Sequence, residues 1–258
     1  MVIALAAIAV AFFTLPLVGL LARAPWSRAS HILSAHASLQ ALRLSVLSAL
    51  AATALSIVFG VPLAWLLARA RFTGLAAVRA LCTLSMVLPP VVAGVALFFA
   101  LGRRGLVGQW LDRWFGIRLP FTSAAVVLAQ TFVAMPFLVL TVEGALRQID
   151  GRHEEAARTL GASGWYTFRR VTLPSIAPAL AAGAVLSWAR ALGEFGATVT
   201  FAGNFPGTTQ TLPLSVYVSL ESDPGAAVVL SLVLVLVSFA VLVALRDRWL
   251  GALRRGLP

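Results

Sequence analysis

The chain has 258 residues, of which 60% are hydrophobic and 11% are charged, and its mean hydropathy is +0.94. A soluble domain could not cover so much apolar surface, so the composition excludes one and predicts an all-α membrane protein. The net charge is +11 and all twenty basic residues are arginine. We assign this excess to cytoplasmic loops rather than to nucleic-acid binding.

Six apolar windows are each long enough to cross a bilayer as a helix of about 20 residues. In chain order they are residues 2–21, 42–67, 80–101, 122–142, 178–199 and 224–245. The first is expected to be a retained span rather than a cleaved leader, because it lacks a basic start and its apolar run is too long. A short helix at the membrane interface is expected within 24–41.

Prolines and glycines predict where two of these helices deviate from a straight course. Gly60 and Pro62 predict a tilt or kink in the second window. Pro89 and Pro90 predict a break in the third window, which would have to face protein or a cavity.

Arginines are more frequent in the segments that lie inside when both termini are placed in the cytoplasm. The positive-inside rule therefore predicts that orientation. We divide the chain into three parts: 1–37, the first span with an outer interfacial segment; 38–246, the main membrane domain with a cytoplasmic loop at 147–174; and 247–258, a cytoplasmic tail.

Few residues are suited to catalysis or metal binding. Cys82 is alone in an apolar run, and the three histidines fall in connecting segments. No lysine occurs in the chain, so the Gly-Lys-Ser/Thr ending of a phosphate-binding loop is excluded. We expect no catalytic residue, no cofactor and no metal site, and any ATP would be bound by another polypeptide.

The loop at 147–174 carries a spaced motif. It reads Glu155-Ala156-Ala157, three residues, Gly161, nine residues, then Val171-Thr172-Leu173-Pro174. The pattern predicts two short helices with a sharp turn: the first starts at Asp150 or Gly151, and Gly161 ends it in a left-handed conformation. Ser163 should cap the second helix and Pro174 should end it before the fifth span.

This spacing resembles the cytoplasmic signature of permease subunits of ATP-binding-cassette (ABC) importers. The resemblance implies the six-helix type I importer fold, with 38–246 as its permease domain. It also implies that Glu155, Ala156, Ala157, Gly161, Leu173 and Pro174 form a coupling element in a groove of a cytoplasmic ATPase. The plain alternative is a solvated loop that only links two spans.

Two further stretches resemble molybdate permeases, and sulfate permeases more distantly. They are residues 187–214, with Ala-Arg-Ala-Leu-Gly-Glu-Phe-Gly-Ala and Thr-Gln-Thr-Leu-Pro, and residues 88–94, Leu-Pro-Pro-Val-Val-Ala-Gly. The resemblance implies import of molybdate or tungstate across a bacterial inner membrane. It also implies a homodimer in the bilayer, two ATPase copies below it and an oxyanion-binding protein outside.

Arg190 and Glu194 lie four residues apart inside the fifth window, and we expect them on one face of its helix. Two interpretations stay open: an internal ion pair that fixes packing, or a contact in the translocation path. Asn204, Thr208 and Gln210 supply hydrogen-bonding groups beyond that window. They would line the entrance, touch a delivering protein or simply solvate a loop.

Three other functions compete with this interpretation. Within the class, the chain could be a sulfate or thiosulfate permease. An intramembrane enzyme would need clustered reactive side chains, and a proton- or sodium-driven transporter would typically need paired intramembrane carboxylates. The sequence offers neither pattern, so both are less favoured.

Overall fold

The computed structural model describes residues 1–254, without the side chains of residue 242 and residues 244–254. Throughout this range the chain folds into helices joined by turns, and no strand occurs among these residues. The predicted fold class is therefore confirmed. Residues 255–258 of the expected tail 247–258 lie outside the described residues.

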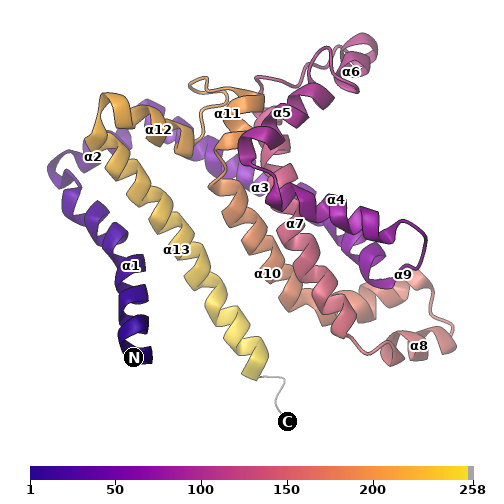
Figure 1. The fold of residues 1–258 in the computed structure, drawn as a ribbon. Helices are drawn as coiled ribbons and strands as arrows, with labels where there is room; N and C mark the ends of the chain where they lie inside the picture. The colour runs from indigo at the N-terminus through magenta and orange to yellow at the C-terminus, as the bar shows by residue number, and fades with distance from the viewer. Residues whose placement is uncertain (255–258) are drawn as a thin grey trace.

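Figure 1 shows the helices in chain order. They are α1 (Val2–Arg23), α2 (Trp26–Ser34), α3 (His36–Arg69), α4 (Leu75–Val87), α5 (Pro90–Leu101), α6 (Gly108–Phe115), α7 (Ser123–Gln148), α8 (Arg152–Thr159), α9 (Gly164–Thr167), the π-helical turn η1 (Phe168–Thr172), α10 (Leu173–Leu192), α11 (Gly196–Ala202), α12 (Leu212–Ser222) and α13 (Pro224–Arg254). The short helix expected within 24–41 is α2, although α3 already begins at His36.

Five helical segments among the described residues are long and apolar enough to cross a membrane. They are Val2–Arg23, His36–Arg69, Ser123–Gln148, Gly164–Leu192 and Pro224–Val241. The third predicted window consists instead of the shorter apolar helices α4 and α5, which separate at Leu88 and Pro89. The break predicted at the proline pair is therefore confirmed. Helix α3 continues through Gly60 and Pro62, and the tilt or kink expected there stays a prediction.

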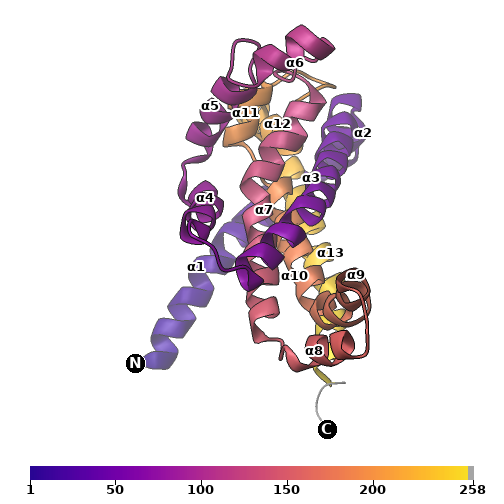
Figure 2. The ribbon, with the colours of Figure 1, turned by 90° about the vertical axis from the view of Figure 1, so that its right-hand side faces the viewer.

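The core of the bundle is formed where α3, α7 and α10 pack against one another (Figure 2). Small residues let these helices approach closely. A Cβ atom on Gly60 of α3 would lie 3.1 Å from Leu138 Cδ2 of α7, and one on Gly183 of α10 would lie 3.1 Å from Leu138 Cα. A second core joins α5, α7 and α11 around Phe201, which is fully buried.

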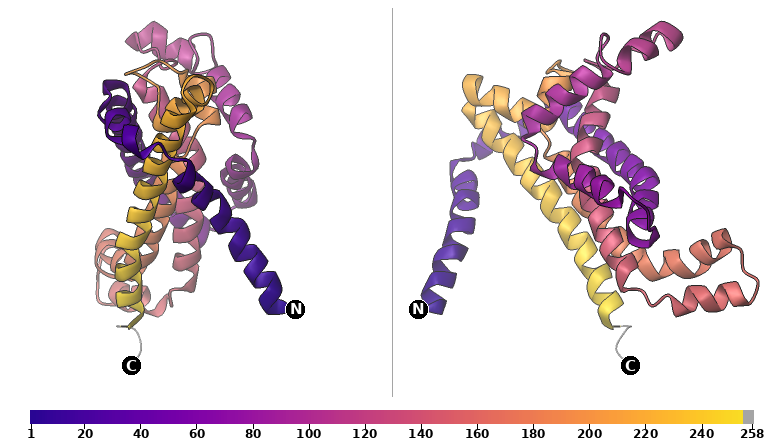
Figure 3. Two further views of the ribbon diagram at one scale, coloured as in Figure 1. Left: turned by 90° about the vertical axis from the view of Figure 1, so that its left-hand side faces the viewer. Right: turned by 45° about the vertical axis from the view of Figure 1, so that its right-hand side comes forward.

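Helix α1 stands apart from the bundle, as Figure 3 shows, and it contacts α13. None of its residues is buried, although the helix is strongly apolar. Figure 1 also shows that α8 and α9 lie at the same end of the molecule as both ends of the described chain, whereas α6 and α12 lie at the opposite end. The expected cytoplasmic loop and both ends of the described chain thus share one side.

Candidate functional site

The loop between α7 and α10 folds as the helical hairpin that its sequence predicts. Asp150 Oδ1 accepts a hydrogen bond from the Arg152 N–H at 3.1 Å, so the first helix starts where expected. Gly161 has a φ of +83°, which is the predicted left-handed conformation. Ser163 Oγ accepts the Tyr166 N–H at 3.3 Å and caps the second helix.

The expectation that Pro174 ends the second helix is wrong. The chain passes without interruption from α9 through η1 into α10, giving one segment from Gly164 to Leu192. In η1 the Leu173 N–H bonds to the Phe168 carbonyl, five residues back. Because the turn is widened there, and because Pro174 lies in the first turn of α10, the missing proline N–H and the bulk of its ring are tolerated.

The hairpin exposes most of the predicted docking residues. Glu155, Ala156 and Gly161 are exposed and Ala157 is half-buried. Leu173 instead packs against the core of α3, α7 and α10, while Pro174 is exposed. The structure therefore gathers the first four residues at the hairpin and places the last two at its junction with α10.

Large apolar side chains that the sequence interpretation missed are also exposed at the hairpin. Leu160 is 88% exposed, Trp165 is 71% exposed and Tyr166 is 55% exposed. A hollow of about 610 Å³ is lined by Leu160 and Tyr166, together with Ala157 and Gly161. The sequence does carry one signal for this exposed surface. Leu160 directly precedes the turn glycine Gly161, at the end of the first helix, where no further turn of that helix follows to cover its side chain.

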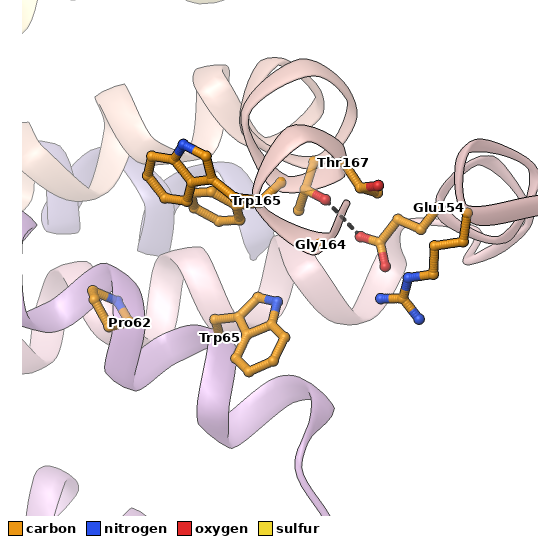
Figure 4. Close-up of a pocket in the computed structure, with 9 residues that line it drawn as sticks. Pro62, Trp65, Glu154, Gly164, Trp165 and Thr167 are labelled. Carbon is orange, nitrogen blue, oxygen red and sulfur yellow. Dashed lines mark hydrogen bonds between the residues drawn. The ribbon is translucent and has the colours of Figure 1, made fainter. Parts of the chain in front are cut away.

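A cavity of about 530 Å³ lies between part of the hairpin and α3. Figure 4 shows Pro62 and Trp65 of α3 on one side of it and Trp165 on the other. The ring of Trp165 stacks on Phe168, with centroids 5.9 Å apart. Glu154 lies at the same cavity and is buried, in contrast to its exposed neighbour Glu155.

Two carboxylates in or near the hairpin make ion pairs that the sequence interpretation did not identify. Glu154 Oε1 accepts a hydrogen bond from Thr172 Oγ1 at 2.8 Å and lies 3.3 Å from Arg69 Nη2. Glu143 of α7 pairs with Arg79 at 2.7 Å and with Arg147 at 2.9 Å. The spacing of four residues between Glu143 and Arg147 was a signal for the second cluster.

Arg190 and Glu194 do pair, but not on one face of a continuous helix. The expectation of such a face is wrong, because α10 ends at Leu192 and Glu194 lies in the break before α11. Arg190 Nη1 is 2.6 Å from Glu194 Oε2, and Glu194 Oε1 accepts the Ala197 N–H at 2.9 Å. The break is stabilised because the carboxylate satisfies an N–H group at the start of α11 that has no partner within that helix.

The remaining predicted path residues lie in the loop between α11 and α12. The Thr208 carbonyl accepts a hydrogen bond from Ser123 Oγ at 2.8 Å, and the Gln210 N–H bonds to the Phe205 carbonyl at 3.0 Å. Asn204 Oδ1 is buried without a protein partner. No hydrogen bond or ion pair between described side chains joins this loop to Arg190 or Glu194, so the five residues do not form one cluster.

Comparison with known proteins decides the family. The family described as "Binding-protein-dependent transport system inner membrane component" matches residues 60–255. The chain belongs to this family. The matched range contains the hairpin, the Arg190–Glu194 pair and the loop after α11.

Two relatives of this chain are named molybdenum transport system permease protein ModB. The one from Mycobacterium tuberculosis H37Rv is 47% identical over 239 residues, which cover 93% of this chain and 90% of the relative. The one from Escherichia coli K12 is 40% identical, covering 84% and 94%. The sulfate transport system permease protein CysT of Escherichia coli K12 is 37% identical, covering 83% and 78%.

Solved structures confirm that the fold is that of an ABC importer permease. A bacterial ABC transporter involved in the import of the polysaccharide alginate matches with a TM-score of 0.71 and 17% identity, covering all of this chain and 95% of the other. The MetNI methionine ABC transporter matches with a TM-score of 0.60 and 21% identity, covering 84% and 98%. At these identities the likeness concerns the fold alone.

Proposed function

We propose that this chain is the membrane permease subunit of an ATP-driven importer that carries molybdate, or the similar oxyanion tungstate, across a bacterial inner membrane. The observation that carries the proposal is the 47% identity to a molybdenum transport permease over 93% of the chain. Both termini would lie in the cytoplasm, on the same side as the hairpin.

A separate ATPase would supply the energy by binding the α8–α9 hairpin. The exposure of Leu160, Trp165 and Tyr166 supports this, because a loop that only linked two spans would have no reason to expose three large apolar side chains together. Glu155, Ala156, Ala157 and Gly161 would form the surface that contacts the ATPase, and Leu173 and Pro174 would join that surface to α10.

The complete importer would contain two copies of this chain, two ATPase copies and an external oxyanion-binding protein. One solved structure similar to this chain is a bacterial alginate ABC transporter in complex with its substrate-bound periplasmic protein. The partners are proposed from that likeness and from the family, whose printed description refers to binding-protein-dependent transport.

For the path, we assign Arg190 to the contact with the oxyanion and Glu194 to holding that arginine in place. The Arg190 side chain keeps 29% of its surface exposed, whereas that of Glu194 keeps 1%. Asn204, Thr208 and Gln210 would offer hydrogen-bonding groups at the outer entrance. Weak contacts suit such a passage, because the anion must leave each position again. ATP-driven movement of the hairpins would alternate access between the two sides.

Uptake measurements test the substrate. The chain is expressed with its ATPase and binding protein in a bacterial strain that lacks its own molybdate and sulfate permeases, and labelled molybdate, sulfate and thiosulfate are compared. Vanadate-sensitive uptake of molybdate is expected. Preferred uptake of sulfate or thiosulfate would instead favour the second candidate, which the 37% identity to a sulfate permease supports.

The orientation has its own test. Fusions of a cytoplasm-active and an export-active reporter to each terminus and to the hairpin should give cytoplasmic activity in all three positions. An exported hairpin would overturn the docking assignment, because the ATPase could not reach it.

A further inference from the structure

Helix α8 is joined to α3 through one side chain, that of Glu154. Glu154 is the buried residue of α8, and it lies between the end of α3 and the turn η1. Its carboxylate accepts a hydrogen bond from the buried Thr172 and pairs with Arg69, the last residue of α3. This single group therefore links the first turn of α8, the turn η1 and the membrane-spanning helix α3.

Apolar packing joins the bundle to η1 rather than to α8, because Phe168 of η1 packs against the core that α3, α7 and α10 form. The cavity of about 530 Å³ lies between Pro62 and Trp65 of α3 and Trp165 of the hairpin, and Figure 4 shows this gap beside Glu154. A packed interface would resist relative movement of the two elements, whereas a cavity leaves room for it. The ion pair between Glu154 and Arg69 is thus a direct contact through which a displacement of α8 would act on α3.

The end of α3 is also held by side chains of α4 and α7. Arg79 and Arg147 donate hydrogen bonds to the Leu67 carbonyl at 3.2 and 3.1 Å, and both pair with Glu143 of α7. The last turn of α3 is therefore held to α4 and α7 by one carboxylate cluster and to the hairpin by another. Because α3 packs along both α7 and α10, a pull on Arg69 would be passed to the central helices of the bundle.

We propose that Glu154 is a positioning residue that links the docking hairpin to the end of α3 through Arg69, and that this ion pair is needed to couple ATP hydrolysis to transport but not to bind the ATPase. The inference rests on the proposed function, since it requires an ATPase at the hairpin. It assigns different roles to two adjacent glutamates: Glu155 faces the partner and Glu154 faces the bundle.

The test uses the importer reconstituted in liposomes with its ATPase and binding protein. Glu154→Gln, Arg69→Gln and the double variant are compared for copurified ATPase and for molybdate transported per ATP hydrolysed. Glutamine keeps an acceptor for Thr172, so the change is confined to the ion pair. The exposed Glu221→Gln, at the opposite end of the bundle, is the matched control for removing one carboxylate.

Each single variant should lower the transport-to-hydrolysis ratio about fivefold, a size typical of residues between coupled sites, while the amount of bound ATPase stays unchanged. The double variant should be no worse than either single one, because the two residues act as one unit. The control should keep the wild-type ratio. Arg69→Gln lies outside the hairpin, so it tests the link even where Glu154→Gln fails to assemble.

Three results would overturn the link. They are an unchanged ratio in both single variants, losses that multiply in the double variant, or a loss of bound ATPase that accounts for the reduced transport. The wild-type protein distinguishes this from failure of the proposed function. If it binds no ATPase, the function fails; if it transports sulfate rather than molybdate with the same variant pattern, the substrate is wrong and the link stands.

Discussion

Glu194 Oε2 lies 2.6 Å from Nη1 of Arg190, although the carboxylate is outside the helix that carries the arginine. The other carboxylate oxygen accepts the Ala197 N–H in the first turn of α11. The pair therefore ties the end of α10 to the start of α11 and fixes the direction in which the chain continues.

Replacing one member of this pair should destabilise the protein. Glu194→Gln removes the carboxylate charge that faces Arg190 and leaves the arginine unpaired next to a buried amide. We expect a loss of about 3 kcal/mol in the free energy of unfolding. Thermal unfolding of the purified protein in detergent measures it. The double variant Arg190→Gln with Glu194→Gln should recover part of this loss, because no unpaired charge remains.

The same variants separate packing from transport. If Arg190 contacts the oxyanion, the double variant transports poorly even where its thermal stability is restored. Normal uptake by a stable double variant would show that the pair serves only to hold α10 and α11 together.

Gly161 should be replaceable only by residues that accept a left-handed backbone. Its φ is +83°, and nothing lies within 4 Å of the position that a Cβ atom would occupy. Conformation rather than space is therefore the constraint. We expect Gly161→Val to cost about 1–2 kcal/mol locally and to reduce ATPase copurification and uptake severalfold, whereas Gly161→Asn should retain most of both. Equal effects of asparagine and valine would contradict the conformational argument.

At Gly94 the constraint is space rather than backbone conformation. A Cβ atom there would lie 2.7 Å from Thr200 Cβ and 2.8 Å from the Ala197 carbonyl oxygen, so α5 and α11 would have to separate. Gly94→Ala should lower the free energy of unfolding by about 1–3 kcal/mol. The matched control is Gly144→Ala in α7, where a Cβ atom meets nothing within 4 Å and where alanine should stabilise by about 0.5–1 kcal/mol. Detergent unfolding of both variants measures the difference, and a neutral Gly94→Ala would contradict the close packing.

The hydrogen bonds that Asp112 accepts from two arginines predict how the stability of the segment between α5 and α7 depends on pH. Hydrogen bonds from Arg118 and Arg103, each at 2.9 Å, lower the pKa of this carboxyl below its ordinary value of 3.8. Since the pKa is lowered in the folded state, the stabilisation is fully present above pH 3.8 and is lost as the pH falls through the lowered value.

Hydrogen exchange of residues 102–118 measures this. Protection should be constant between pH 5 and 8 after correction for intrinsic rates, whereas Asp112→Asn should lower it throughout this pH range. Asp150→Asn, which removes a carboxylate at the opposite end of the molecule, should leave the exchange of this segment unchanged. A wild-type protein whose protection fell between pH 8 and 5 would contradict the assignment to Asp112.

The parts of the site that were predictable depend on local rules. Gly161 and Ser163 were identified because a left-handed helix end and a capping hydroxyl are properties of a few neighbouring residues. The helix end expected at Pro174 and the shared helix face expected for Glu194 were wrong, because a widened turn and a break after α10 depend on how the helix packs. Glu154 was missed because its partners Arg69 and Thr172 lie 85 and 18 residues away in the chain.

The sequence by itself determined that the chain is an all-helical membrane protein, where its apolar windows lie and where the hairpin turns, because hydrophobicity and backbone preferences act over short stretches. Only the tertiary structure decided which of two adjacent glutamates turns inward, which arginines hold the end of α3, and where a cavity lies between the hairpin and α3. Those features arise when distant helices pack, and the position of a side chain along one helix does not specify what the neighbouring helix places opposite it.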